Sequence, residues 1–465
     1  MDRDRRRGGD MASVSVWQDR LEETALAPVR RTTARFWALV AAEVAVVAWG
    51  IYAYTVQLRD GLVVTGMRDR ISWGLYIATF VFFIGISHAG TLISAILRVS
   101  QARWRTPVTR IAEFITVVAL ICGASFVIID LGRPDRVLFV FIYGRWQSPI
   151  IWDVLAITTY LTGSIVYLFV PMIPDLALFR DRLAGRTSRW RTWLYRTLAI
   201  GWNGNSSQRR SLAAAIGVLM ILIMPIAVSV HTVVSWIFAM TLRVPWNSAL
   251  FGAFFVAGAI FSGIAILIIV MAILRRTYRL HEYVTEKQFL YLGYLLAAFA
   301  AIMIYANISE LLIHGYKLEE GAEFHLRQLF LNDFAPLFWF YLIGGLFGPI
   351  VIALVPATRN TLGVVVAAVL VTIAMWIERY VIVVSGLRVP LMPYTPADYA
   401  PTWVEWSILA GGLALFALLI TLFTKIFPII AVWEVAEDHE ATVSAIELTP
   451  PAVPEMPAPS GGTYS

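Results

Sequence analysis

The chain has 465 residues, of which 59% are hydrophobic and 15% are charged, and its formal net charge is +6. Soluble domains average about 45–50% apolar residues, so this composition excludes an ordinary soluble protein and indicates a membrane protein. The excess of positive charge follows the pattern of membrane topology described below, and it gives no reason to infer nucleic-acid binding.

Residues 1–35 are predicted to be a polar N-tail. Acidic and basic side chains alternate along it, and it has no apolar core. A cleavable signal peptide needs such a core, so we expect the first apolar stretch to act as an uncleaved anchor.

Ten stretches after the N-tail are long and apolar enough to cross a bilayer, which takes about 20 residues. They cover residues 36–58, 73–97, 110–130, 149–172, 211–238, 248–274, 288–313, 334–357, 361–385 and 403–427. Backbone polar groups must be satisfied internally within lipid, so such runs predict helices. The predicted fold class is all-α, a polytopic membrane protein of about ten transmembrane helices. Residues 435–465 are acidic and then rich in Pro and Ala, which predicts a disordered C-tail.

The basic residues predict the orientation of these helices. Of the 37 Lys and Arg residues, 26 lie in the N-tail or in and beside every second connection between spans. Another 10 lie in the alternate connections. Cytoplasmic loops carry the excess of positive charge, so we expect both termini to be cytoplasmic.

Ionisable residues inside the predicted spans are functional candidates, because burying them in lipid is costly. They are Glu43, His88, Glu113, Asp153, His231, Glu310, Glu378, Arg379 and Glu405. Counting residues along each span places His88 somewhat beyond the midplane and His231 nearer the outer leaflet. His88 and His231 fit either a proton route or a structural role, and Glu378–Arg379 fits either an internal ion pair or a transport role.

The connection Asp130–Arg136 is far more charged than its surroundings. Gly132 permits a tight exit from the preceding helix and Pro134 prevents its continuation. Together with Asp153, the acidic and basic residues of this connection are expected to form a polar cluster at the outer leaflet. One interpretation is a helix stop with interfacial ion pairs, and the other is a proton-accepting site for a quinone, with carboxylates near the membrane boundary.

Several motifs then resemble the NrfD-like membrane subunits, which include the anchor of polysulfide reductase and the large membrane subunits of alternative complex III. The matching segments are Trp73-Gly74, residues 82–91 around His88, Asp130–Pro134, Ser148-Pro149, Trp152-Asp153, Val230-His231 with Ser235, residues 255–263, Glu378–Tyr380 and residues 401–407. The resemblance covers about residues 36–435.

The resemblance implies a transmembrane domain over residues 36–430 with two four-helix bundles, at about 73–238 and 248–385, flanked by a helix at each end. It implies a quinone-reactive subunit of a respiratory oxidoreductase complex in the bacterial cytoplasmic membrane, with menaquinone or ubiquinone as its cofactor and no haem, metal or iron–sulfur cluster of its own. The implied partners are an extracytoplasmic four-cluster ferredoxin-like iron–sulfur subunit, other membrane subunits, and cytochrome or molybdopterin subunits.

Site roles follow from the motifs and from this resemblance together. The candidates for the quinone site and its proton exchange are Asp153, Asp130 and Arg133. Those for a proton path are His88, His231, Glu378 and Arg379, and Tyr76, Tyr160 and His88 are further candidates for contact with the quinone. In the quinol subunit of alternative complex III a histidine stands at the position of Asp130, so the aspartate here also fits another complex, or a companion subunit that conducts protons.

An internal duplication is faintly visible, because Ala95–Arg98 and Ala272–Arg275 both read Ala-Ile-Leu-Arg. The second copy has nothing like Asp130–Arg136, so a single quinone site should belong to the first bundle.

Two other functions stay open. Paired bundles with carboxylates near the midplane fit a secondary transporter or proton channel. A haem-bearing cytochrome would need histidines at matched depth, which the count along the spans does not give.

Overall fold

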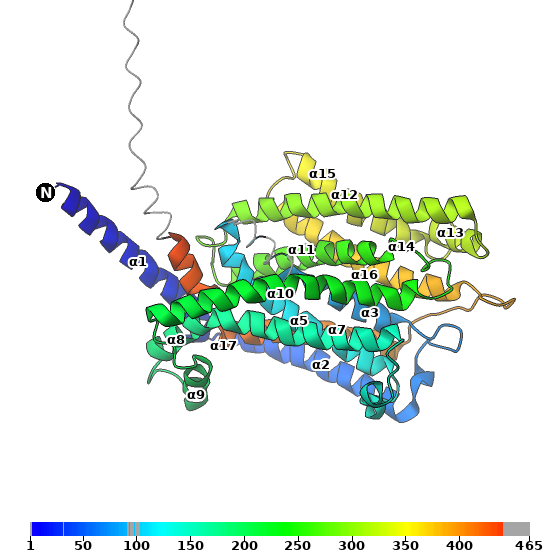
Figure 1. Ribbon diagram of the computed structural model, residues 1–465, viewed down its shortest axis with the longest axis horizontal. Helices are drawn as coiled ribbons and strands as arrows, with labels where there is room; N and C mark the ends of the chain where they lie inside the picture. The colour runs from blue at the N-terminus through cyan, green and yellow to red at the C-terminus, as the bar shows by residue number, and fades with distance from the viewer. Residues whose placement is uncertain (1, 31, 91–92, 94–96, 98–102, 440–465) are drawn as a thin grey trace, which may run out of the picture.

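The computed structural model describes residues 2–30, 32–90, 93, 97 and 103–439, and these form an almost wholly helical protein (Figure 1). The helices are α1 (Asp2–Arg30), α2 (Ala34–Asp60), α3 (Leu75–Ile86), α5 (Thr106–Asp130), α6 (Phe139–Ile142), α7 (Pro149–Phe169), α8 (Ile173–Arg182), α9 (Arg189–Leu198), α10 (Ser206–Ala239), α11 (Phe251–Thr277), α12 (Glu286–Lys317), α13 (Ala322–Phe330), α14 (Ala335–Phe340), α15 (Gly348–Leu354), α16 (Thr361–Arg388) and α17 (Trp403–Ile426). The π-helical segment Tyr341–Phe347 joins α14 to α15.

The predicted all-α membrane fold is confirmed. Nine helices in the described part of the chain are long and apolar enough to span a membrane, and they match nine of the ten predicted stretches. The tenth stretch, 73–97, contains the shorter apolar helix Leu75–Gly90. Its continuation falls partly on residues outside the described ranges.

Polar side chains begin several of these helices by capping free backbone N–H groups. Ser148 accepts a hydrogen bond from the N–H of Ile150, directly before α7. Thr402 and Glu405 form a reciprocal capping box at the start of α17. These caps stand where the apolar runs begin, so the local sequence itself sets where the helices start.

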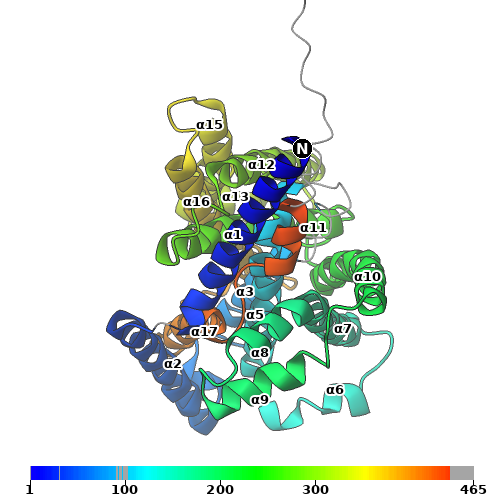
Figure 2. The ribbon, with the colours of Figure 1, turned by 90° about the vertical axis from the view of Figure 1, so that its left-hand side faces the viewer.

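The spanning helices lie roughly parallel and pack in neighbouring groups (Figures 1 and 2). α3 packs on α5, α5 on α7, and α7 on α10, while α11 packs on α12 and α16, and α16 on the π-helical segment. α3 occupies the centre of the end-on view and also contacts α11 and α16, so it joins the two groups. α2 and α17, the first and last spans, pack against each other at the side.

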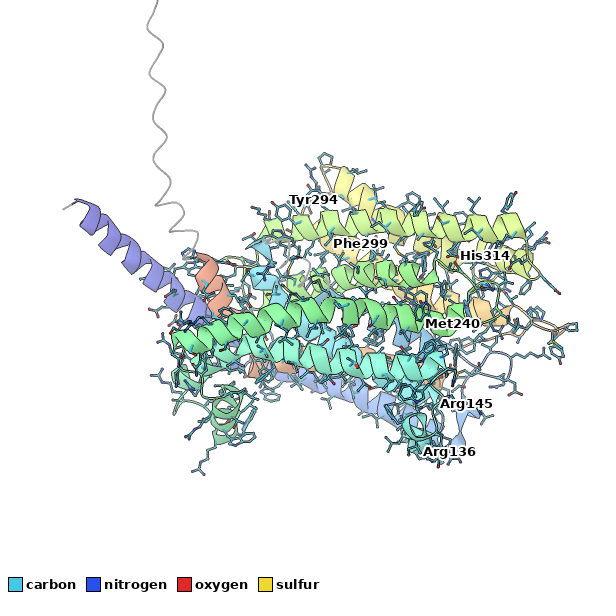
Figure 3. The ribbon with its side chains drawn as sticks, in the orientation of Figure 1. Arg136, Arg145, Met240, Tyr294, Phe299 and His314 are labelled. Atoms are coloured by element: carbon cyan, nitrogen blue, oxygen red, sulfur yellow. The ribbon has the colours of Figure 1, made fainter. Side chains whose placement is uncertain are left out.

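The molecule has two distinct ends, which we name by the short helices that lie there. The α6 end carries Arg136, Arg145 and Met240, and the α9 end carries α8 and α9 (Figures 1 and 3). α1 also lies at the α9 end (Figure 1), where Lys425 near the end of α17 donates to the carbonyl of Pro28 at 2.8 Å. Residues 432–439 are helical, so the prediction that the disordered tail starts at residue 435 is wrong for 435–439, and its remainder lies outside the described residues.

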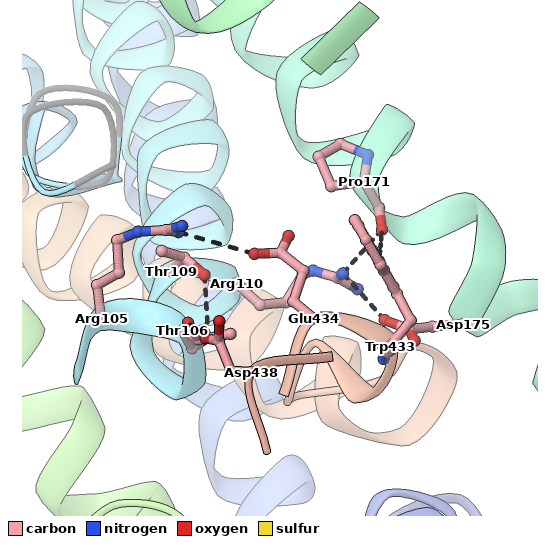
Figure 4. Close-up of polar contacts among 9 residues, drawn as sticks. All are labelled: Arg105, Thr106, Thr109, Arg110, Pro171, Asp175, Trp433, Glu434 and Asp438. Carbon is pink, nitrogen blue, oxygen red and sulfur yellow. Dashed lines mark hydrogen bonds and ion pairs between the residues drawn. The ribbon is translucent and has the colours of Figure 1, made fainter. Parts of the chain in front are cut away.

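A buried ion pair fixes the α9 end (Figure 4). Arg110 of α5 lies 3.0 Å from Asp175 of α8, and both side chains are 1% exposed. The other oxygen of Asp175 accepts from the N–H of Trp433 at 3.1 Å. The indole of Trp433 and the guanidinium of Arg110 both donate to the carbonyl of Pro171. These contacts lock the segment after α17 onto α5 and α8.

Candidate functional site

Two carboxylates of the first helix group lie near the α6 end. Asp130 is the last residue of α5, and Asp153 lies near the start of α7, which packs against α5. Gly132 adopts a left-handed conformation with φ of 64°, which gives the predicted tight exit from α5. Each aspartate has one buried Oδ1 atom that makes no hydrogen bond within the described part of the chain. Buried polar atoms are normally paired, so each is a candidate to accept a proton or a ligand hydrogen bond.

A second carboxylate network ties down the connections at this end. Glu405, fully buried, accepts from the backbone N–H of Gly66 at 2.7 Å and of Thr402 at 3.0 Å. Tyr399 donates its hydroxyl to Glu405 and accepts from the N–H of Leu75 at 2.8 Å. Burial raises the pKa of Tyr399, and the neighbouring Glu405 raises it further, so this phenol stays protonated as the donor.

The two tyrosines predicted to contact a quinone already have protein partners. Tyr76 donates to Gln57 of α2 at 2.6 Å, and Gln57 donates in turn to the carbonyl of Ile129 at 2.9 Å, next to Asp130. Tyr160 donates to the carbonyl of Ser87 at 3.0 Å, deeper in the group. Tyr76 therefore connects to the end of α5, whereas Tyr160 supports the segment that carries His88.

Arg133 takes a different position from the one expected. Its guanidinium lies 2.9 Å from Asp135, and both side chains are about 60% exposed, at 62% and 59%. The predicted cluster is therefore divided. Arg133 and Asp135 pair on the surface of the α6 end, whereas the Oδ1 atoms of Asp130 and Asp153 are buried and make no hydrogen bond to a described residue.

His88 and His231, which the count along the spans placed at different depths, are in contact. Their ring centres lie 4.1 Å apart with the planes at 75°. His88 follows Trp73 by 15 residues and His231 precedes Phe238 by only seven, although Trp73 and Phe238 are neighbours with ring centres 5.6 Å apart. A count of residues assumes an unbroken helix and ignores that helical side chains lean toward the N-terminus of their own helix. In α3 and α10, which run in opposite directions, the two imidazoles lean toward each other.

The contact also changes the argument about haem. The histidines are at matched depth after all, so the earlier reason against a haem between them was wrong. A porphyrin bound between two axial imidazoles needs space for its iron and ring, and a separation of 4.1 Å between the ring centres leaves none. His88 instead contacts the carbonyls of Ala227 at 2.8 Å and Ile84 at 3.2 Å. Neither ring nitrogen of His231 makes a hydrogen bond to a described residue.

A break in the helix exposes backbone groups beside His88. The regular turns of α3 end at Ile86, and the carbonyl of Ser87 accepts from Thr116 at 2.6 Å as well as from Tyr160. Discontinuous membrane helices are tolerated where other groups satisfy the freed backbone. The break therefore places a polar layer around the two histidines in the middle of the protein.

Glu378 and Arg379 form the predicted internal ion pair in α16. Arg379 Nη1 lies 2.8 Å from Glu378 Oε2, and both side chains are buried. Gly258 of α11 makes room for the pair, since a Cβ there would lie 2.6 Å from Arg379 Nη2. One turn further along the same face of α11, Ser262 lies near Gly85 and His231, because a Cβ on Gly85 would lie 3.0 Å from Ser262 Oγ and 4.0 Å from His231 Nε2. The ion pair and the histidine pair therefore both lie along this face of α11.

The sequence analysis did not identify two residues of this network, Gln57 and Tyr399. Gln57 is 2% exposed in α2, most of whose side chains are not buried, and a lone amide in an apolar run was the available sign. Tyr399 lies in a connection rich in Pro and Tyr, and its long-range contact with Leu75 leaves no local pattern in the sequence.

Comparison with known proteins shows which family the chain resembles. Residues 63–390 match the family model described as polysulphide reductase, NrfD. The chain is 27% identical to a Halobacterium salinarum protein named as a membrane component of dimethyl sulfoxide reductase, over 86% of this chain and 92% of that protein. It is 25% identical to the Hdr-like menaquinol oxidoreductase integral membrane subunit of Archaeoglobus fulgidus, over 87% and 97%. It is also 25% identical to the integral membrane subunit of menaquinone reductase from Nitratidesulfovibrio vulgaris, over 82% and 88%.

The family match spans both helix groups and includes all the predicted site residues, from Tyr76 to Arg379. The resemblance expected from the sequence motifs is confirmed, and the chain belongs to the NrfD polysulphide reductase family.

Proposed function

We propose that this chain is the quinone-reactive membrane subunit of a respiratory oxidoreductase complex of the cytoplasmic membrane, and that the quinone ring binds at the α6 end of the first bundle. The observation that carries the proposal is that Asp130 and Asp153 at this end each have a buried Oδ1 atom without a partner among the described residues. Relatives named as menaquinol and menaquinone oxidoreductase subunits support the ligand class.

The unpaired oxygens of the two aspartates fit a quinol. A quinol supplies electrons and protons together, so its site needs proton acceptors beside its hydroxyl groups. Asp153 is 5% exposed and takes this role first, while Asp130 is held next to the Tyr76–Gln57 pair. The hydroxyls of Tyr76 and Tyr160 are already donated to protein acceptors, so they position the site and do not release protons themselves.

The surface of the α6 end is the proposed contact for an extracytoplasmic iron–sulfur partner. Arg133 and Asp135 are exposed there, and Phe141, Tyr143 and Trp146 are exposed at 52%, 72% and 69%. Exposed aromatic side chains beside charged ones are typical of protein contact surfaces. Electrons from the quinol would cross to the partner here, and the distribution of basic residues supports an orientation with the α6 end outside and the basic α9 end in the cytoplasm.

Protons are proposed to move through the middle of the protein along His88, His231, Arg379 and Glu378. His88 and His231 touch, and neither ring nitrogen of His231 makes a hydrogen bond to a described residue. Arg379 Nη2, also without a hydrogen bond in the described ranges, lies beside Gly258, one turn from Ser262 on the same face of α11. Intramembrane ionisable groups in such a series are typical of proton relays.

The test is quinol oxidation by the purified complex carrying Asp153→Asn. Loss of a positioned proton acceptor should lower turnover by about 100-fold or more. Glu43→Gln is the matched control, because Glu43 is also a carboxylate within a span but bonds Thr421 on the far pair α2 and α17. Turnover of Asp153→Asn equal to that of the control would refute the role of Asp153.

A further inference from the structure

The second helix group contains a pocket at the α6 end that the proposed site does not use. Its cavity volume is about 90 Å³, several times the roughly 10–15 Å³ that a single water molecule needs. α11, α12, α13, α16 and the connection before α11 all contribute to its lining. Figure 3 places His314, one of the lining residues, near this end of α12.

The walls of the pocket include several aromatic side chains. Trp246, Phe251, Phe254, Phe338 and Tyr341 line it, and each is at most 5% exposed. Trp246 is held in place by a hydrogen bond of 2.8 Å from its indole to the carbonyl of Ile382. Flat, rigid side chains of this kind favour a planar ring between them.

Polar atoms converge on the same space. Ser385 is fully buried and His325 is 8% exposed, and Ser385 Oγ and His325 Nδ1 make no hydrogen bond to any described residue. Both side chains line the pocket. Two unsatisfied buried groups facing one cavity are costly unless a ligand pairs with them.

The pocket also has a group that can exchange protons. Glu310 accepts a hydrogen bond from Ser248 and lies 3.7 Å from His314 on the next turn of α12. The side chain of Glu310 is 14% exposed and that of His314 is 9% exposed. Glu378, the last residue of the proposed proton path, lines the same pocket, so the path ends in it.

Glu310 occupies a position in the second group that corresponds to Asp130 in the first. Asp130 stands 24 positions after Thr106, the first residue of α5, and Glu310 stands 24 positions after Glu286, the first residue of α12. α3 and α11, the helices before these two, pack face to face, since a Cβ on Gly263 would lie 2.7 Å from the backbone of Ala89. The duplicated architecture therefore presents a carboxylate at the α6 end twice.

We propose that this pocket is a second binding site for a quinone-type ring, with Ser385 and His325 donating hydrogen bonds to its oxygens and the Glu310–His314 pair beside it. The ligand class rests on the proposed function, whereas the site itself rests on the cavity, its aromatic walls and its unpaired polar atoms. The protein would then have two quinone sites, whereas the sequence analysis predicted one, in the first bundle.

The test uses the purified complex in phospholipid nanodiscs with a photoreactive azidoquinone, and labelled peptides are mapped by mass spectrometry. The wild type should be labelled both around Asp130–Asp153 and within residues 307–329 or 378–385. Ser385→Leu fills the second pocket and should reduce its labelling by about tenfold while labelling near Asp153 persists. Ser229→Leu, an exposed position on α10, is the matched control and should change neither.

Three further experiments can each support or overturn the proposal. If Ser385→Leu does not fold, Ser385→Ala and His325→Gln should each weaken labelling of the second pocket, and unchanged labelling in both overturns the proposal. Equal labelling of this pocket by a photoreactive fatty acid would identify a lipid chain and also overturn it. Asp153→Asn distinguishes the second site from the proposed site near Asp153. If this variant is labelled only in the second pocket, the second site is supported independently of the first. If the wild type is labelled only in the first bundle, the second site is refuted.

Discussion

His88 and His231 meet edge to face at the centre of the protein, with 4.1 Å between their ring centres, yet they are bonded very differently. His88 lies 2.8 Å from the carbonyl of Ala227 and thereby connects α3 to α10. His231 has two buried ring nitrogens without a partner in the described ranges. A buried polar group that makes no bond lowers stability, so the protein keeps His231 at a cost.

The two histidines should therefore respond in opposite ways to apolar substitution. His88→Ala loses a bond between helices and should lower the free energy of unfolding by roughly 1–3 kcal/mol. His231→Leu removes unpaired polar atoms, so it should leave the unfolding midpoint in detergent unchanged or raise it, while quinol-linked proton release by the complex falls. A marked drop in the midpoint of His231→Leu would show that His231 is a structural residue.

The close approach of α3 and α11 gives a second prediction. A Cβ on Gly263 would lie 2.7 Å from the backbone N of Ala89, which cannot move aside as a side chain could. Gly263→Ala should therefore destabilise the protein by about 1–3 kcal/mol through overpacking. Gly217 in α10 has nothing within 4 Å of such a Cβ, so Gly217→Ala is the control and should be neutral or slightly stabilising. Equal unfolding midpoints for the two variants would contradict the packing of α3 on α11.

The third prediction concerns acid stability. Burial, and to a smaller extent the neighbouring His314, lowers the pKa of His325 to about 3 from its ordinary 6.5. As the pH falls below 6.5 the unfolded chain takes up a proton that the folded chain refuses, so stability is lost between pH 6.5 and 3, by at most about 1.4 kcal/mol per pH unit. Thermal unfolding from pH 7 to 4 should show a smaller loss in His325→Gln than in the wild type. The exposed His281→Gln serves as control, and a loss as large in His325→Gln as in that control would contradict the burial of His325.

A fourth prediction tests the ion pair at the α9 end. Asp175→Asn leaves Arg110 buried without its charge partner, which typically costs about 3–5 kcal/mol. Replacing both residues, as Arg110→Met with Asp175→Leu, should restore much of that loss, because two buried charges are then removed together. Arg327→Ala breaks the exposed pair with Glu323 and should leave the unfolding midpoint unchanged. A double variant no more stable than Asp175→Asn would show that the charges themselves hold this end together.

Hydropathy predicted the fold well because each span is a local property of the chain. The same holds for Asp130 and Asp153, whose places near helix ends follow from Pro134 and Ser148-Pro149. The contact between His88 and His231 could not be predicted by counting residues, because it depends on the lean of side chains in antiparallel helices. Arg133 took its nearest carboxylate, Asp135, since that pair forms in solvent without burying a charge.

The packing of the terminal segments was also not predicted from the sequence. Alternating charges hid the apolar positions Leu21, Ala25, Leu26 and Val29 of α1, all of which are buried. Their spacing follows one face of a helix, but Leu26 and Val29 pack with residues 172–195 and Phe423, which lie far along the sequence. Such a contact becomes visible only in three dimensions.

The pairing of α2 with α17 has a consequence for biosynthesis. Gly50 and Gly411 let these helices approach closely, since a Cβ on Gly50 would lie 2.8 Å from the Cα of Gly411. Trp403, the first residue of α17, is made 343 residues after Asp60, the last of α2. At synthesis rates of about 5–20 residues per second, α2 waits roughly 20–70 s in the bilayer before its partner emerges. During that interval the newborn helix depends on lipid, or on an insertion chaperone, to shield the groove at Gly50.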